Sequence, residues 1–269
     1  RIQYPEQSDL ALERKLEEKY GLTEALIAVP AYEQSSDQEV AFQAVDYILR
    51  VLKKNMVFGM TWGRAMHEFV EQLAKDERLR SLSFQNVKVV PFLGTPGAIQ
   101  SDSWNTTTYS NTLATKVGNL LHCASYNLSA PMYVEGTKEK ELIESIDEIA
   151  KVLHMAETAD IALIGIGSMQ DDSSIIKAEI RTKEEYKELV RKGAVGEIVG
   201  RIYDKNGQTV DEDLKRKMVG ISLDKIAKIP VRVGMSYGKD KIEAIKGAIA
   251  GGLVNVLVTD VPTAELLLK

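Results

Sequence analysis

One turn in this sequence places a hydroxyl, an indole and a guanidinium where they could bind an anion. The apolar run Val57–Met60 predicts a strand, and the residues after the turn predict a helix with one buried face. The turn consists of Thr61, Trp62, Gly63 and Arg64, and the buried helix face of Met66, Phe69, Val70 and Leu73. The start of a helix carries partial positive charge and N–H groups without internal partners. The turn is therefore a candidate anion site, although an ordinary strand-to-helix turn shows the same pattern.

Four other loops that follow predicted strands also carry hydroxyl residues, and three of them contain glycine. These loops are Gly94–Gly97, Gly165–Ser168, Met235–Gly238 and Thr259–Asp260. Parallel sheets bind ligands outside the carboxyl ends of their strands, where such loops converge. Glycine admits a ligand close to the backbone, hydroxyls donate and accept hydrogen bonds, and Lys241 could add a charge for a phosphate. The set favours a polar, oxygen-rich ligand with a phosphate, whereas each loop by itself is compatible with turn chemistry alone.

Other kinds of site are disfavoured. The run Gly165-Ile166-Gly167 lacks the third glycine of a dinucleotide fingerprint, because Gln170 stands in its place, and no P-loop is present. The three histidines and Cys123 have no metal-ligand spacing, so neither a metal nor another cofactor is expected. Asp171 and Asp172 are the best carboxylates for acid–base work, but capping or solvating their loop is the favoured interpretation. Trp62 could stack on a ligand ring, wall the pocket or fill the core.

The order of predicted elements indicates an α/β fold. Apolar runs alternate with amphipathic stretches of helical period along the chain, which is typical of a mostly parallel, Rossmann-like sheet with helices on both faces. Asn206-Gly207 between Arg201–Asp204 and Gln208–Val210 predicts a small antiparallel hairpin as an elaboration. Thr182 and Glu185 fit a capping box at the start of a helix. Residues 1–269 are predicted to form one domain.

Composition narrows the class of protein. Of the 269 residues, 44% are hydrophobic and 27% charged, as in a soluble globular protein, and no apolar run reaches membrane-spanning length. The net charge of −5 and the lack of a basic stripe argue against nucleic-acid binding by this polypeptide itself. A single cysteine fits a reducing compartment, so a cytoplasmic location is expected.

Several of these segments, taken in order along nearly the whole chain, resemble the effector-binding domain of bacterial transcriptional regulators of the SorC family, also called SorC/DeoR-type. The matching segments are Gly59–Met66, Val89–Gly94, Tyr109–Asn111 with Leu113-Ala114, Gly165–Ser168, Gly196–Ile198, Gly200–Asp204 with Gly207, Val219–Leu223, Lys241–Ile249 and Asn255–Asp260.

The resemblance implies a fold like that of sugar-phosphate isomerases and deaminases, used for sensing instead of catalysis. It implies that a phosphorylated sugar or polyol binds the domain and modulates operator binding, and that the protein forms a homo-oligomer, a dimer or a tetramer. DNA would be contacted only through an N-terminal helix-turn-helix domain, which is expected in a full-length protein and absent from this chain. No membrane partner and no catalytic residue are expected. The predicted ligand-binding residues are Thr61, Trp62, Gly63, Arg64, Gly94, Thr95, Tyr109, Gly167, Ser168 and Lys241.

Two positions depart from the family pattern. Leu93 stands where some members carry a basic residue that touches the ligand, so neither a bisphosphate nor a covalent imine with a sugar aldehyde is expected. With little else basic nearby, the turn at Thr61–Arg64, helped by Lys241, is expected to hold a single phosphate. Ser236-Tyr237-Gly238 replaces a small Gly-Gly and would narrow that side of the pocket.

Two alternatives remain at this point. The chain could be an isomerase- or deaminase-like enzyme on sugar phosphates; deaminases of this fold carry Asp-Gly-His after the Gly-Ile-Gly loop, whereas Ser168–Asp172 stands here without a histidine. An isomerase that uses Asp171 is not excluded. The chain could also be an interaction module with an empty pocket.

Overall fold

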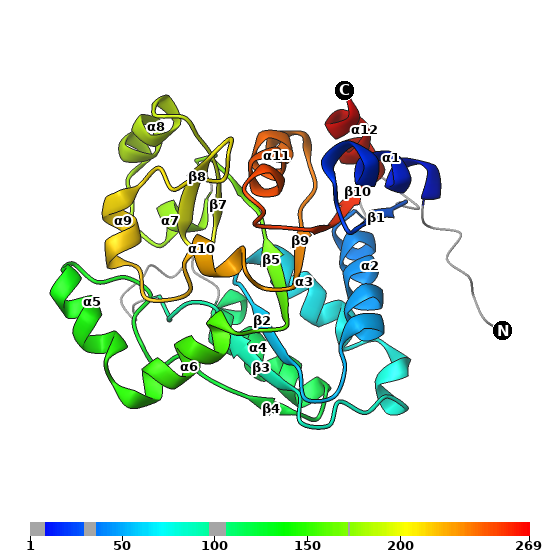
Figure 1. Cartoon of the computed structure of the whole chain (residues 1–269), viewed down its shortest axis with the longest axis horizontal. Coiled ribbons are helices and arrows are strands. Elements are labelled where there is room, and N and C mark those ends of the chain that lie inside the picture. The colour runs from blue at the N-terminus through cyan, green and yellow to red at the C-terminus, as the bar shows by residue number, and fades with distance from the viewer. Residues whose placement is uncertain (1–8, 30–35, 97–105, 172) are drawn as a thin grey trace.

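Seven parallel strands form the centre of the molecule, in the order β1-β10-β9-β5-β2-β3-β4 (Figure 1). The structure is a computed structural model that describes residues 9–29, 36–96, 106–171 and 173–269. The predicted α/β fold with a mostly parallel sheet is confirmed. The strands are β1 (Glu24–Ala28), β10 (Val256–Asp260), β9 (Val231–Met235), β5 (Ile161–Gly165), β2 (Val57–Met60), β3 (Lys88–Pro91) and β4 (Ala124–Ser125).

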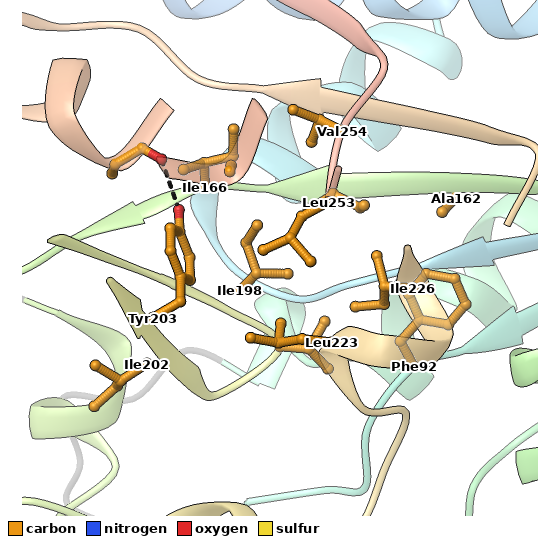
Figure 2. Packing of buried hydrophobic residues seen from close by; sticks show 14 of the residues in the cluster. Phe92, Ala162, Ile166, Ile198, Ile202, Tyr203, Leu223, Ile226, Leu253 and Val254 are labelled. Atoms are coloured by element: carbon orange, nitrogen blue, oxygen red, sulfur yellow. Dashed lines mark hydrogen bonds between the residues drawn. The ribbon is translucent and has the colours of Figure 1, made fainter. Parts of the chain in front are cut away.

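Both faces of this sheet are buried, which explains why its strands are apolar throughout. Successive side chains of a strand point to opposite faces. In β1, Ala25 and Ile27 belong to one hydrophobic cluster, and Leu26 and Ala28 to the other. Figure 2 shows part of the first cluster, in which Leu253 lies beside Ile198. A sheet covered in this way needs helices on both sides.

The helices form one layer on each face. One group of helices covers the hydrophobic cluster that contains Leu26, and a second group covers the cluster that contains Ile27. The first group is α2 (Ser36–Val51), α3 (Arg64–Leu73) and α4 (Ser110–Leu120). The second group is α1 (Leu10–Tyr20), α6 (Asp147–Glu157), α11 (Ile242–Ala250) and α12 (Val261–Leu268).

A three-stranded antiparallel sheet lies beside the main sheet and forms the predicted elaboration. It consists of β6 (Gly167–Ser168), β7 (Ala194–Ile198) and β8 (Arg201–Asp204). The hairpin between β7 and β8 turns at Val199 and Gly200, which have φ of 55° and 69°. The predicted turn at Asn206-Gly207 is present. Among the described residues, however, the two segments that it joins form one isolated bridge, Tyr203 to Thr209, instead of a pair of strands. The main hairpin was missed because valine at positive φ is not a recognisable turn signal.

The remaining elements are short and lie mainly around this small sheet. The predicted capping box is confirmed at α8, where Thr182 and Glu185 bond reciprocally. These elements are α5 (Thr137–Glu144), α7 (Ser174–Lys177), α8 (Lys183–Arg191), α9 (Glu212–Lys217), α10 (Leu223–Ile226) and the 3-10 turns η1 (Glu77–Arg80), η2 (Thr106–Thr108) and η3 (Lys239–Lys241).

The two edges of the main sheet differ in how their backbone hydrogen-bonding groups are covered. At the β1 edge, the backbone N–H groups of Ala25 and Ile27 donate to the carboxylates of Glu17 and Glu13 in α1, at 2.9 and 3.0 Å. Those carboxylates occupy donors that an incoming strand would need. The opposite edge is β4, only two residues long, and no comparable side-chain cover of it occurs among the described residues.

Gly59 in β2 supports the core by leaving room for an aromatic ring. A Cβ at this position would lie 2.0 Å from the Cε1 atom of Phe92, which is fully buried. We expect Gly59→Ala to lower the free energy of unfolding by about 1–3 kcal/mol, since overpacking forces the ring and backbone to shift. Urea denaturation measures this change.

The matched control is Gly136→Ala, at the start of α5. A Cβ there would meet nothing closer than 3.9 Å, and the backbone angle is not positive. It should not destabilise the protein by overpacking, because the added methyl group has room and the backbone angle is allowed. Equal effects of the two substitutions would contradict the packing argument.

Candidate functional site

The chain leaves two neighbouring central strands in opposite directions. From β2 it runs to β3 on one side, and from β5 it runs through the small sheet to β9 on the other. Ligands of α/β proteins bind outside the carboxyl ends of strands at such a switch point. Two hydrogen bonds join the strand ends here: Thr61 N–H donates to the carbonyl of Leu163 (3.1 Å), and Gly165 N–H donates to Thr61 Oγ1 (3.0 Å). The two predicted loops therefore meet at one place.

The start of α3 faces this point. Gly63 precedes the helix with φ of 104°, a conformation that favours glycine, and its N–H donates to the carbonyl of Thr108 (3.0 Å). The helix begins at the exposed residue Arg64, and Gly63, as its N-cap residue, has no side chain that could cap it. A helix start next to a guanidinium is a competent anion site.

Trp62 is a buried wall of the site. Its exposed fraction is 6%, and its side chain hydrogen-bonds the carboxylate of Glu197 on β7. Glu197 also accepts a hydrogen bond from the N–H of Gly200 in the hairpin turn. Gly167 lies directly opposite, since a Cβ there would approach Glu197 Oε2 to 2.8 Å. The indole N–H is therefore used by the protein, which fits a wall or core role.

Ser168, Asp240 and Lys241 form a second polar group at the site. Ser168 Oγ donates to Asp240 Oδ2 (2.9 Å), and Lys241 Nζ donates to Ser168 Oγ (3.0 Å). Lys241 Nζ also lies 3.8 Å from Asp240 Oδ2 and is only partly exposed. This network holds the ammonium group in place on the β9 side of the switch point.

Glu197 is a buried carboxyl of the site, and its acidity is strongly altered. Burial raises the pKa of the Glu197 carboxyl to about 7, while the Gly200 N–H, Lys241, Trp62 and Arg201 act against burial and lower it. Its proton occupancy therefore changes near neutral pH. The sequence offered no motif for this residue beyond its place in the segment Gly196–Ile198.

Tyr109 adjoins the site, whereas Gly94 and Thr95 have other partners. Tyr109 immediately precedes α4, where Ser110 Oγ donates to the carbonyl of Met60 (3.0 Å) at the end of β2. Gly94 is buried, and a Cβ there would lie 2.5 Å from the carbonyl oxygen of Ala130. Its glycine is thus explained by packing.

Thr95 accepts a hydrogen bond from Asn111 Nδ2 (2.8 Å) at Oγ1. With Asn111 and Asn127 it lines a hollow of about 530 Å³ between α4 and the segment that follows β4. Its hydroxyl therefore already has a hydrogen-bond partner within the protein. Gly97 lies outside the described residues.

A buried cation lies behind Leu93, contrary to the expectation that little else basic is near. Leu93 is fully buried and pairs with Gly220 in an antiparallel bridge. Arg201 Nη2 donates to the carbonyls of Gly220 and Met218, both at 3.1 Å. Its exposed fraction is 3%, and its Nε and Nη1 have no hydrogen-bond partner among the described residues. Burial lowers the pKa of Arg201 to about 10, an effect that Glu144 and Glu197 oppose.

The other candidate groups do not join the site. Asp171 forms an exposed ion pair with Lys183 at 3.5 Å, and Asp172 lies outside the described residues. Within the described ranges, no three His, Cys, Asp or Glu side chains are placed to bind a metal ion together. No helix in the part of the chain that the structure describes could span a membrane.

Comparison with known proteins was made by sequence. The family model described as "Putative sugar-binding domain" matches residues 4–269. The chain is 30% identical over 272 residues to the sorbitol operon regulator of Klebsiella pneumoniae, a match that covers 100% of this chain and 83% of that protein. It is 26% identical over 262 residues to the deoxyribonucleoside regulator of Bacillus subtilis, covering 96% of this chain and 80% of that protein.

Solved structures agree with these relatives. The full-length sorbitol operon regulator SorC from K. pneumoniae superimposes with a TM-score of 0.86 at 28% identity, over 100% of this chain and 83% of that one. A DeoR family transcriptional regulator from Listeria monocytogenes gives a TM-score of 0.82 at 26% identity, over 96% and 98%. This chain thus belongs to the sugar-binding domain family of SorC-type transcriptional regulators.

Proposed function

We propose that this domain binds a phosphorylated sugar or polyol at the switch point between β2 and β5. The observation that carries the proposal is the position of the start of α3, which lies where the loops after β2 and β5 meet. Arg64 also lies within electrostatic reach of Tyr237, in the loop that leads from β9 to Lys241. Two cations and a helix N-terminus thus border one edge of the sheet, and such a combination suits one phosphate.

The ligand would divide into a charged and a neutral part. The phosphate would accept hydrogen bonds at the start of α3, with Arg64 beside it. Lys241 and Ser168 already bond one another and offer donors to the hydroxyl groups or the phosphate of the ligand. Trp62 would line the pocket with the apolar surface of its ring, because its N–H is hydrogen-bonded to Glu197 and is not available to the ligand.

In the whole protein we infer that this ligand acts as an effector of transcription. The relatives named above are operon and nucleoside regulators, and the chain covers 83% of the sorbitol operon regulator. We propose that DNA is bound by a helix-turn-helix segment outside residues 1–269, within a homo-oligomer in the cytoplasm. The effector would change operator affinity only through unequal affinity for two arrangements of that assembly.

The enzyme alternative is less well supported. Asp171, the one carboxylate left open for an isomerase, is exposed and paired with Lys183. The relatives are regulators by name. We therefore propose a sensing role without turnover. An assay on pentose and hexose phosphates tests it: isomerisation that Asp171→Asn abolishes would overturn the proposal.

Binding is tested by calorimetry and thermal shift with sugar phosphates and their unphosphorylated parents. A phosphorylated ligand should raise the melting temperature, and its parent should not. Lys241→Met should weaken that ligand by about tenfold to a hundredfold, because a hydrogen bond from a charged group contributes about 1.5–3 kcal/mol.

The control is Lys246→Met on the exposed side of α11, where Lys246 pairs only with Glu243 (3.1 Å) among the described residues. It should leave affinity unchanged. If none of the ligands stabilises the domain, an interaction module with an empty pocket would be favoured. Equal affinity for a sugar phosphate and its unphosphorylated parent would refute the phosphate site.

The raised pKa of Glu197 predicts a pH-dependent stability. The unfolded carboxyl has a pKa near 4.5 and the folded one a pKa of about 7. Between these values the unfolded chain has lost a proton that the folded chain retains. The free energy of unfolding should therefore fall as pH rises from about 4.5 to 7, by about 3 kcal/mol from this group, and should level off above pH 7.

Glu197→Gln should remove this part of the slope in urea denaturation at a series of pH values. Glu243→Gln, an exposed glutamate on α11, should retain it. Identical slopes in the Glu197→Gln variant and the original chain would show that the buried carboxyl does not titrate in this range.

A further inference from the structure

Asp240 brings a carboxylate to the β9 side of the candidate site. It lies in η3, directly before Lys241, and its Oδ2 atom accepts a hydrogen bond from the Ser168 hydroxyl at 2.9 Å. Its Oδ1 atom lies over the backbone of Gly238, since a Cβ on Gly238 would be only 2.9 Å from it. Gly238 has φ of 109°, and its N–H donates to Thr263 Oγ1 (2.8 Å). The carboxylate is thus held between strand β6 and a fixed turn.

The hydroxyl of Ser168 has already given its proton to this carboxylate. Ser168 is 4% exposed, and its oxygen accepts a hydrogen bond from Lys241 Nζ (3.0 Å) while its one proton is donated to Asp240. A ligand anion can therefore receive that proton only if Asp240 releases it. A ligand hydroxyl, by contrast, can donate its own proton to the carboxylate and accept one from the ammonium group of Lys241.

The charge of Lys241 is balanced by carboxylates. Its Nζ lies 3.8 Å from Asp240 Oδ2, and the buried carboxyl of Glu197 is also within electrostatic reach of it. Lys239, the other cation of η3, is exposed, and neither hydrogen bond of Ser168 involves it. An anionic group brought to Lys241 would meet Asp240 at a similar distance, so repulsion would cancel most of the attraction.

We infer that Asp240 is a specificity-determining residue, which makes the β9 side of the site accept neutral hydroxyl groups and reject a second anionic group. This preference rests on the proposed function and narrows it. The phosphate lies at the start of α3, and the part of the ligand that meets Ser168 and Lys241 is uncharged. Phosphorylated neutral sugars and polyols are then bound in preference to phosphorylated sugar acids. A like charge set against the wrong ligand is one of the ways in which proteins achieve specificity.

Pairs of ligands that differ in one terminal group test the role of Asp240. Glucitol 6-phosphate ends in a hydroxymethyl group where 6-phosphogluconate has a carboxylate, and the five-carbon alditol and aldonate phosphates form a second pair. In calorimetry, the original chain should bind the polyol phosphate of a pair more tightly than the acid. Asp240→Asn keeps the size of the side chain and an acceptor oxygen but removes the charge. It should strengthen binding of the acid by about tenfold relative to the polyol.

The matched control is Glu243→Gln on α11, because it removes a carboxylate that is exposed and paired with Lys246 (3.1 Å). It should leave the ratio of the two affinities unchanged. A structural defect in Asp240→Asn would lower both affinities without changing their ratio, so the ratio reports on the charge.

Two results would overturn the role of Asp240 and leave the proposed function standing. One is an original chain that binds the acid as tightly as the polyol, and the other is the same ratio of affinities in Asp240→Asn as in the original chain. Binding of no phosphorylated ligand at all would instead refute the proposed function, and the role of Asp240 with it.

Discussion

The geometry of the candidate site depends on how Thr61 joins two strands. Its N–H and its hydroxyl both bond to β5, so the ends of β2 and β5 are fixed against one another at the centre of the sheet. The chain then leaves these strands in opposite directions. The start of α3, the small sheet and the β9 loop all take their positions from this junction. A fixed arrangement of donors lowers the ordering cost of binding a small polar ligand.

Behind that junction the protein buries charges that polar contacts only partly compensate. Glu197 bonds the Trp62 side chain and the N–H of Gly200, while Arg201 has two carbonyl partners and two nitrogens without any described partner. The hairpin turn that links the two residues has a valine at positive φ, and the Glu197 carboxylate stabilises the turn through Gly200. Buried groups of this kind are costly, and they fix local structure tightly when their bonds are complete.

The periphery of the sheet obeys a different constraint. Parallel strands expose backbone donors and acceptors at both edges, and each edge needs cover. At β1, two glutamates of α1 provide it from within the chain. At β4, the strand is shortened to two residues and an apolar groove lies alongside. The two edges of one sheet are thus protected by different means.

The sequence by itself determined the architecture, because the periodicity of helices and strands and the burial of their faces both select which residues are apolar. The apolar runs at 57–60 and 161–165, the helix face of Met66 and Leu73, and the capping box at Thr182 are local patterns, and the structure has each of them. The turn at Thr61–Arg64, Ser168 and Lys241 could be selected because strand-exit loops meet at one edge of a parallel sheet.

Only the tertiary structure decided which groups those residues meet. Glu197, Asp240 and Arg201 reach the site through contacts between distant segments, and no local pattern marks them. Thr95 and Asp171 were candidates by position in the chain, and only the structure shows that their partners are Asn111 and Lys183. The propensity to form a helix, strand or turn depends on residues that are adjacent in the sequence. The pKa of a carboxyl group and the partner of a guanidinium depend instead on residues that pack around it from distant parts of the chain.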